Sequence, residues 1–312
     1  MRLLKPGQEI DFIGKRRIAV IGSLILIALS VFAFVTRGIN LGIDFTGGTL
    51  VEVGYDRAID LENVRAALGS ADFRDVTVQH FGRSSDVLIR VAPREDISSE
   101  ALSDKVFSGL KARHDGRVDL RRVEFVGPRV GKQLTEKGGL AVLYALIGIL
   151  IYVAVRFEYR FAIGAVVALI HDVTITMGVF SLFQIEFNLN ELAAVLAVIG
   201  YSLNDTIVVY DRIRENFRRH RKGTPETITN SSLNETLSRT LMTSLTTMLV
   251  LVALFLLGGE IIHGFSLALL VGIFVGTYSS IYVASVAALA LGISKSDLMP
   301  VQKEGADTPK IG

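Results

Sequence analysis

Ionisable side chains inside long apolar runs are the residues of this sequence whose types best support chemistry. His171-Asp172 lies in one such run, Asn204-Asp205 lies in the next, and Arg239 stands at the start of another. Charged groups within a membrane are rare and mark ion pathways or helix contacts, so each is a candidate functional residue. Gain and loss of a proton by a carboxylate is the reaction that these groups support. We therefore expect protons as the coupling ion and no other cofactor.

Enzyme signatures are missing from the 312 residues. The sequence contains no GxSxG, no HExxH, no P-loop and no cysteine, so it offers no thiolate nucleophile and no Cys-based metal site. The net charge of +2 indicates no nucleic-acid partner. We expect neither an enzyme nor a metal protein.

Asp205 and Arg239 are expected at the same depth in the membrane. Asp205 lies about 9 Å inside the Arg212 end of its helix, and Arg239 lies about 9 Å inside its own if that helix begins near Leu233. The two side chains can then form an ion pair, in which the carboxylate titrates because arginine keeps its proton. The pair is either a proton relay or a static contact that fixes helix packing.

Neighbouring polar residues are candidates for a supporting role. Thr243 shares a helix face with Arg239, and Asn204 precedes Asp205. His171 and Asp172 point about 100° apart on their helix. Either one carries a proton directly, or both form hydrogen bonds to neighbouring helices.

Small residues predict close helix contacts. The last apolar run contains a GxxxG pattern, and the run with Asp205 has a similar small face, which allow backbones to approach each other. These predicted packing residues are Gly272, Gly276, Ala197 and Gly200.

Six apolar runs are long enough, with their flanking turns, to span a bilayer. Lysine and arginine gather in the N-terminus, the tail and the loops on that side, whereas the short loops 184–191 and 258–264 have neither. The positive-inside rule then places both termini in the cytoplasm. The predicted organisation is a cytoplasmic N-terminus (1–17), a first span (18–36), a periplasmic domain (37–137), spans at 138–155, 161–183 and 191–211, a basic cytoplasmic loop (212–232), spans at 233–257 and 265–291, and a cytoplasmic tail (292–312).

The outer segment reads as a small α+β domain. Strand patterns cover 49–55, 76–81, 86–91 and 118–126, and Asp60 and Ser98 or Ser99 can cap helices to about 68 and 111. The order β-α-β-β-α-β predicts a ferredoxin-like fold with one sheet face left open to a ligand or partner. The fold class is thus a polytopic helical membrane protein with this domain between its first two spans.

Four segments carry a resemblance to a known family. They are Gly42–Thr49 (GIDFTGGT), Val126–Leu134, Leu192–Asn216 and Asn234–Ser244. By itself the first segment is a turn into the first strand, and it is not a phosphate loop because no GK[ST] follows. Together the four resemble the SecD/SecF family of bacterial protein-export membrane proteins, whose motif falls here on Gly42, Asp44, Phe45, Gly47 and Gly48.

That resemblance implies a function. Its members work as SecD–SecF pairs related to the resistance-nodulation-division transporters, in the bacterial inner membrane. They assist the SecYEG channel, with SecA and accessory subunits in the wider complex, and use the proton-motive force to export unfolded polypeptides. The family's proton-conducting carboxylate and arginine correspond to Asp205 and Arg239.

Two other functions remain open from the residues. One is a half-transporter for a small hydrophobic solute, and the other is a structural membrane scaffold. For the basic segment 212–232, anionic lipid headgroups and the acidic surface of a partner are both candidate contacts.

Overall fold

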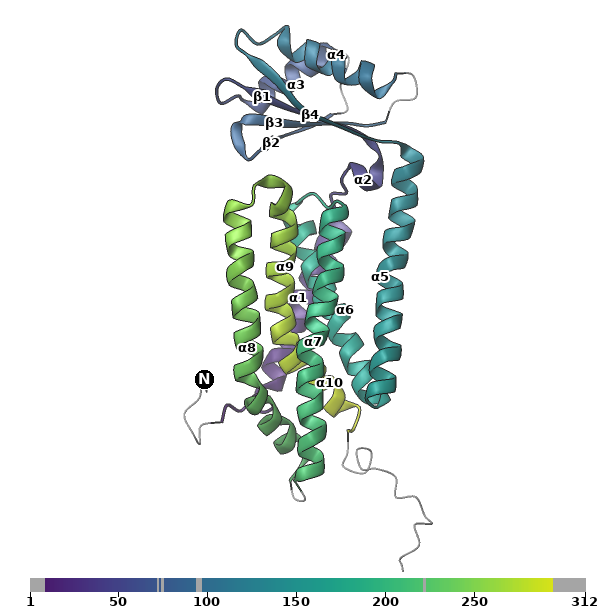
Figure 1. The fold of residues 1–312 in the computed structure, drawn as a ribbon, viewed down its shortest axis with the longest axis vertical. Coiled ribbons are helices and arrows are strands. Elements are labelled where there is room, and N and C mark those ends of the chain that lie inside the picture. Colours follow the sequence, from purple (N-terminus) through teal and green to yellow (C-terminus); the bar gives the residue numbers. More distant parts are fainter. Residues whose placement is uncertain (1–8, 72, 74–75, 94–96, 221–222, 294–312) are drawn as a thin grey trace, which may run out of the picture.

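The computed structural model describes residues 9–71, 73, 76–93, 97–220 and 223–293. Long helices form a bundle, and a small sheet domain stands at one end of it (Figure 1). Within the described residues, six helices are long and apolar enough to cross a membrane, as predicted. They are α1 (Arg16–Arg37), α5 (Pro128–Arg156), α6 (Tyr159–Phe183), α7 (Leu189–Arg219), α8 (Pro225–Leu257) and a sixth made of α9 (Glu260–Ser279), the π-helical turn η1 (Ser280–Ala284) and α10 (Ser285–Ala290).

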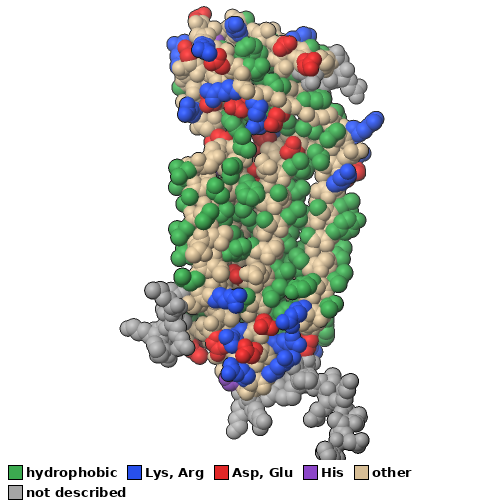
Figure 2. Space-filling model, viewed as in Figure 1, with side chains coloured by type: hydrophobic (Ala, Val, Ile, Leu, Met, Phe, Trp, Pro, Cys, Tyr) green, Lys and Arg blue, Asp and Glu red, His purple; other side chains and the backbone are tan. Residues whose placement is uncertain are grey.

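Side-chain chemistry divides the surface into zones. Charged side chains gather over the sheet domain and at the opposite end of the bundle, and a mostly hydrophobic band lies between them (Figure 2). This band has the character of a surface that faces lipid.

The helices are longer than their apolar runs. α8 begins at Pro225 rather than near Leu233, because Thr224 caps it by accepting a hydrogen bond from the Thr227 amide at 3.3 Å. α7 extends to Arg219 and α5 starts at Pro128. The prediction of a loop at 212–232 is therefore wrong, because this basic segment is mainly the ends of two helices. Part of it (221–222), residues 1–8 and the tail from 294 lie outside the described residues.

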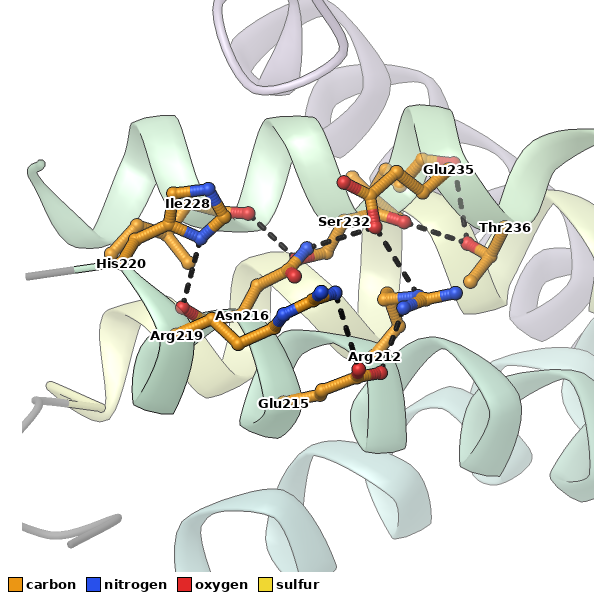
Figure 3. A network of polar contacts seen from close by, with 10 residues as sticks. Arg212, Glu215, Asn216, Arg219, His220, Ile228, Ser232, Glu235 and Thr236 are labelled. Carbon is orange, nitrogen blue, oxygen red and sulfur yellow. Dashed lines mark hydrogen bonds and ion pairs between the residues drawn. The ribbon is translucent and has the colours of Figure 1, made fainter.

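Polar contacts join these two helix ends (Figure 3). Asn216 of α7 donates to Ser232 Oγ at 3.0 Å and to Glu235 Oε2 at 3.1 Å on α8. Arg212 pairs with Glu215 at 2.7 Å and with Glu235 at 3.2 Å. Part of the positive charge of this segment is thus neutralised within the hairpin.

The sheet domain has the predicted order of elements. Its antiparallel sheet runs β2-β3-β1-β4, and α3 and α4 cover one face (Figure 1). Asp60 caps α3 and Ser98 caps α4. The elements are β1 (Gly48–Tyr55), α3 (Leu61–Ser70), β2 (Val76–Phe81), β3 (Arg83–Val91), α4 (Ser99–Lys111) and β4 (Val118–Val126).

The two faces of the sheet differ in what covers them. Val51, Val53 and Ile89 point into the core beneath α3 and α4. Leu50 and Leu88 point the other way and are buried together with Ile43 of α2 (Ile43–Thr46). The sheet face predicted to be open is therefore partly closed by a single helical turn.

Candidate functional site

Asp205 is buried in the middle of α7, among three helices. Its side chain is 2% exposed. Oδ2 accepts a hydrogen bond from Ser244 Oγ of α8 at 3.3 Å, and Ser244 accepts one from Thr277 Oγ1 of α9 at 2.7 Å. The local sequence places these groups because Ser244 and Thr277 are the small polar positions where α8 and α9 meet α7. The result is an acidic group in a low-dielectric interior with hydroxyls as its partners.

Arg239 does not form the predicted ion pair with Asp205. Among the described residues, no salt bridge joins the two, and the Arg239 side chain is exposed on α8. Its carbonyl accepts a hydrogen bond from Thr243, which is also exposed. The guanidinium is close enough to act electrostatically on Asp205 without contacting it.

An open strip of α7 lies in the same region. Ala197, Gly200 and Asn204 are exposed, and no atom lies within 4 Å of a methyl group placed on Gly200. The predicted small face of this span therefore packs against nothing in the described residues. Together with Arg239 and Thr243, these residues form a surface on α7 and α8 that we call the open face.

The GxxxG pair is buried, in contrast. A methyl group on Gly272 would collide with Val198 of α7, and one on Gly276 would lie 3.0 Å from Ser202 Cβ. These two glycines let α9 approach α7 closely, as the pattern predicts.

His171 and Asp172 form a second buried polar cluster. The two residues are 3% and 0% exposed, and His171 Nδ1 lies 2.8 Å from Asp172 Oδ1. The other carboxylate oxygen, Oδ2, accepts from Ser202 Oγ of α7 at 2.5 Å and from Ser279 Oγ of α9 at 2.7 Å. Asp172 therefore joins three helices.

The histidine ring continues the cluster to α1. His171 Nε2 lies 3.2 Å from Ser23 Oγ, which lies 3.0 Å from the Tyr278 hydroxyl. Tyr278 in turn donates to the Ala19 carbonyl at 2.7 Å. A continuous set of hydrogen bonds thus runs from α7 through α6 and α1 to α9.

Sequence reasoning missed most of the hydroxyl partners of the two carboxylates. Serines and threonines are ordinary in membrane helices, so single ones give little signal. The run Thr277-Tyr278-Ser279-Ser280 in an apolar span was the available sign. Ser202 and Ser279 bond to Asp172 and Ser244 bonds to Asp205. The hydroxyls linked to these residues or to His171 are Ser23, Thr277 and Tyr278.

The glycine motif after α1 forms a joint between the sheet domain and the bundle. Gly42 donates its amide to the Phe187 carbonyl at 2.9 Å, and Phe45 stacks on the Phe187 ring with centroids 5.9 Å apart. Asp44 Oδ2 accepts from the Leu189 amide, the first residue of α7, at 3.0 Å. The motif is thus more than a turn, because it caps the helix that carries Asp205.

Close backbone contacts explain the glycines of this joint. Gly47 and Gly48 have φ values of +72° and +128°, which residues with side chains rarely adopt. A methyl group on Gly47 would lie 3.0 Å from Pro128 Cα, at the start of α5. The joint therefore ties β1, α5 and α7 together.

A polar cavity lies between the sheet domain and the bundle. Its volume is about 430 Å³, and Asp44, Glu124, Glu191 and Glu260 are among its lining residues. Glu186 at its edge pairs with Arg90 at 2.7 Å. Among the described residues, no group of three His, Asp or Glu side chains is arranged to hold a metal ion.

Comparison with known proteins identifies related chains. Residues 107–294 match the family described as protein export membrane protein SecD/SecF, C-terminal, and residues 32–59 match the SecD/SecF GG motif. The protein translocase subunit SecF of Vibrio alginolyticus is 54% identical, covering 98% of each chain.

Solved structures show the same fold. The crystal structure of SecDF from Thermus thermophilus, a translocon-associated membrane protein, superposes with a TM-score of 0.83 at 38% identity over 91% of this chain. SecDF in its super-membrane-facing form gives a TM-score of 0.69 over 93% of this chain. In both cases this chain spans only 39% of the solved chain.

Proposed function

The chain belongs to the SecD/SecF family of protein-export membrane proteins, and we propose that it couples inward proton flow at Asp205 to movement of its sheet domain during export. Its place in the family is that of the SecF subunit, a multi-pass membrane protein associated with SecD and the Sec translocase. The proposed complex contains a SecD-type partner that acts at the SecYEG channel together with SecA, and its substrate is an unfolded polypeptide.

One observation carries this proposal: an acidic side chain is buried within a membrane-spanning helix without a salt-bridge partner among the described residues. Asp205 accepts its hydrogen bond from Ser244, and Arg239 stays out of contact. A static structural pair would place the two charges together, because an unpaired buried charge is strongly unfavourable. An acid in such surroundings is suited to gain and lose a proton.

The partner completes the site in this proposal. The open face carries Arg239 beside small residues that allow close helix packing. A SecD-type partner that covers this face buries Arg239 and places its own groups near Asp205. The site is therefore assembled from both subunits.

The joint supplies a mechanical link from the proton site to the outer domain. Asp205 lies on α7, and Asp44 clamps the first turn of the same helix. A shift of α7 is thus passed to β1 through Gly47 and Gly48. One proton that crosses 100 mV releases about 2.3 kcal/mol, enough to change a two-state population about fifty-fold.

The proposed orientation follows from the charges of the short loops. Both termini lie in the cytoplasm and the sheet domain lies in the periplasm of the inner membrane. A reporter fused within 36–139 is expected to read as periplasmic, and one fused after Arg219 as cytoplasmic. The same side for both fusions would refute this topology.

The cavity beneath the sheet domain disfavours export of a hydrophobic solute. Its volume of about 430 Å³ is adequate for a small molecule, but its lining carries Asp44, Glu124, Glu191 and Glu260. Apolar ligands select apolar walls, so these carboxylates oppose that alternative.

The decisive experiment replaces Asp205 by asparagine in the complex with the SecD-type partner. Asp205→Asn keeps the shape and removes the titratable group, so we expect normal assembly with loss of proton flux in vesicles and of proton-driven export. Asp211→Asn is the matched control, because Asp211 lies on the same helix with its side chain 59% exposed. Normal flux and export in Asp205→Asn would make Asp205 a packing residue and favour the scaffold function.

A further inference from the structure

The cluster around His171 and Asp172 is not used by the function proposed above. His171 lies halfway along α6, and both side chains are almost fully buried. Partners from α1, α7 and α9 surround them with hydroxyl groups. A histidine and a carboxylate in contact at such depth form a pair that can hold a proton.

The contacts of Ser23 and Tyr278 fix where the protons are at that end of the cluster, whereas the one Ser279 proton is shared between Asp172 at 2.7 Å and the Gly276 carbonyl at 3.1 Å. A backbone carbonyl only accepts, so the Tyr278 hydroxyl gives its one proton to Ala19. The contact between Ser23 and Tyr278 then needs the Ser23 proton. Ser23 has no second proton for His171, so the His171 Nε2 atom must donate to Ser23.

The remaining contact needs one more proton. His171 Nδ1 and Asp172 Oδ1 lie 2.8 Å apart, and neither a bare nitrogen nor a carboxylate oxygen can donate. One proton therefore lies between them, either on the ring as imidazolium or on the acid. In both cases the pair is neutral overall, which is the state that a membrane interior favours.

We propose that His171 and Asp172 are a second proton-binding site, separate from Asp205, and that its proton controls the hydrogen bond between Ser23 of α1 and Tyr278 of α9. In the loaded state described above, Ser23 donates to Tyr278. The ligand of the site is a single proton.

Loss of that proton to water forces a rearrangement. If Nε2 kept its proton, the lone pair of Nδ1 would face the Asp172 carboxylate, which is repulsive. The favoured arrangement places the one remaining ring proton on Nδ1, where it forms a charge-assisted bond to Asp172. Nε2 is then bare and accepts from Ser23, so Ser23 no longer donates to Tyr278. The single Tyr278 proton can serve either Ala19 or Ser23, so one of the two hydrogen bonds between α1 and α9 is lost.

Few other titratable groups act on this site. Tyr278 of α9 is bonded to it through Ser23, and Asp205 lies one turn from Ser202 on α7. Ser202 and Ser279 are the groups of α7 and α9 that face Asp172 directly. The side-chain contacts of His171 and Asp172 run to each other and to hydroxyl groups, so the bound proton itself compensates the charge of the carboxylate.

This inference deepens the proposed proton-driven function and rests on it only for the role of the second site in export. The state of His171 itself can be read by spectroscopy. A failure of Asp205 to carry protons and a failure of the present proposal are therefore separate results.

The test is a nitrogen-15 NMR titration of histidine in the full complex. The chain is labelled on its five histidines, assembled with its SecD-type partner in lipid nanodiscs, and measured from pH 5 to 10. Loss of a signal in His171→Gln assigns the residue. We expect Nε2 protonated on the acid side, and a change to the tautomer with Nδ1 protonated and Nε2 bare on the alkaline side.

Tyr278→Phe tests the link to α9. In the wild type, deprotonation of the pair costs the hydrogen bond from Ser23 to Tyr278. In Tyr278→Phe this bond is already absent, so deprotonation has no such cost. The His171 midpoint should therefore fall by about 0.4 to 1 pH unit, the equivalent of one net hydrogen bond. Asp205→Asn should keep the transition, because the two sites are separate.

Three results would each contradict the proposal or a part of it. A single His171 tautomer across the whole pH range in the wild type would overturn it. An unchanged or raised midpoint in Tyr278→Phe would overturn the link to Ser23. Disappearance of the transition in Asp205→Asn would show one site rather than two.

Discussion

Gly48→Ala should destabilise the start of β1, where the sheet domain joins the bundle. Gly48 has a φ of +128°, and a methyl group there would lie 2.6 Å from the Val91 carbonyl oxygen on β3. The obstacle is backbone, so no side chain can turn aside to make room. Both the strained φ and the collision oppose the substitution.

The size of the effect follows from these two terms. A side chain in a region of φ reserved for glycine costs about 1–3 kcal/mol, and overpacking costs about as much again. The total of about 2–6 kcal/mol is a large part of the stability of a small domain. Gly139→Ala is the control, because no atom lies within 4 Å of its methyl group on α5 and alanine favours a helix by up to about 1 kcal/mol.

Hydrogen exchange measures the effect in the intact complex. The amides of β1 and β3 should exchange at least about thirty-fold faster in Gly48→Ala, since about 1.4 kcal/mol is a factor of ten. Gly139→Ala should show no acceleration. Equal protection in the two variants would refute the argument that this position requires glycine.

Three further predictions concern the site, the interface and the sheet domain. Arg239→Lys should lower proton flux and export, because a compact ammonium cannot replace the planar guanidinium; unchanged flux would speak against a role for its shape. Gly200→Leu should weaken co-purification with SecD and leave this chain folded, whereas Gly272→Leu should lower its thermal stability by collision with Val198; the reverse pattern would contradict the assignment of the open face. The hydrogen bond from His114 lowers the pKa of Asp56, so this contact should stabilise the sheet domain above the usual carboxyl range and lose its effect as the pH falls through that lowered pKa. Hydrogen exchange against pH should show this dependence in the wild type and not in His114→Gln.

The sheet domain was largely predictable from the sequence because its signals are local. Asp60 and Ser98 each precede a helix and cap it, and alternation marks the strands. The end turns of the membrane helices were missed because apolar windows stop at polar residues. The start of α8 had its own signal in Thr224-Pro225-Glu226, a cap followed by a proline in the first turn.

The partner of Asp205 could not be predicted from depth along the helices. Depth fixes the height of a residue in the membrane and leaves the rotation of its helix open. The polar face of Arg239 and Thr243 is real, but it points outward, and Ser244, about 100° further round, faces Asp205. The same freedom hid the tie between His171 and Ser23, since nothing local relates positions 148 residues apart.

The π-helical turn Ser280–Ala284 shifts the phase of the sixth span. A π turn holds one residue more than an α turn, so the helix beyond it is offset by about 100° from a continuous α-helix. Before the turn, Gly272 and Gly276 pack on α7. The backbone of Ala284, the last residue of the turn, and of Ala288 beyond it packs on Gly164 of α6. The span therefore consists of two helical segments that present different faces to their neighbours. Deletion of one residue within the π turn would restore α-helical periodicity but would rotate one segment away from the helix on which it packs.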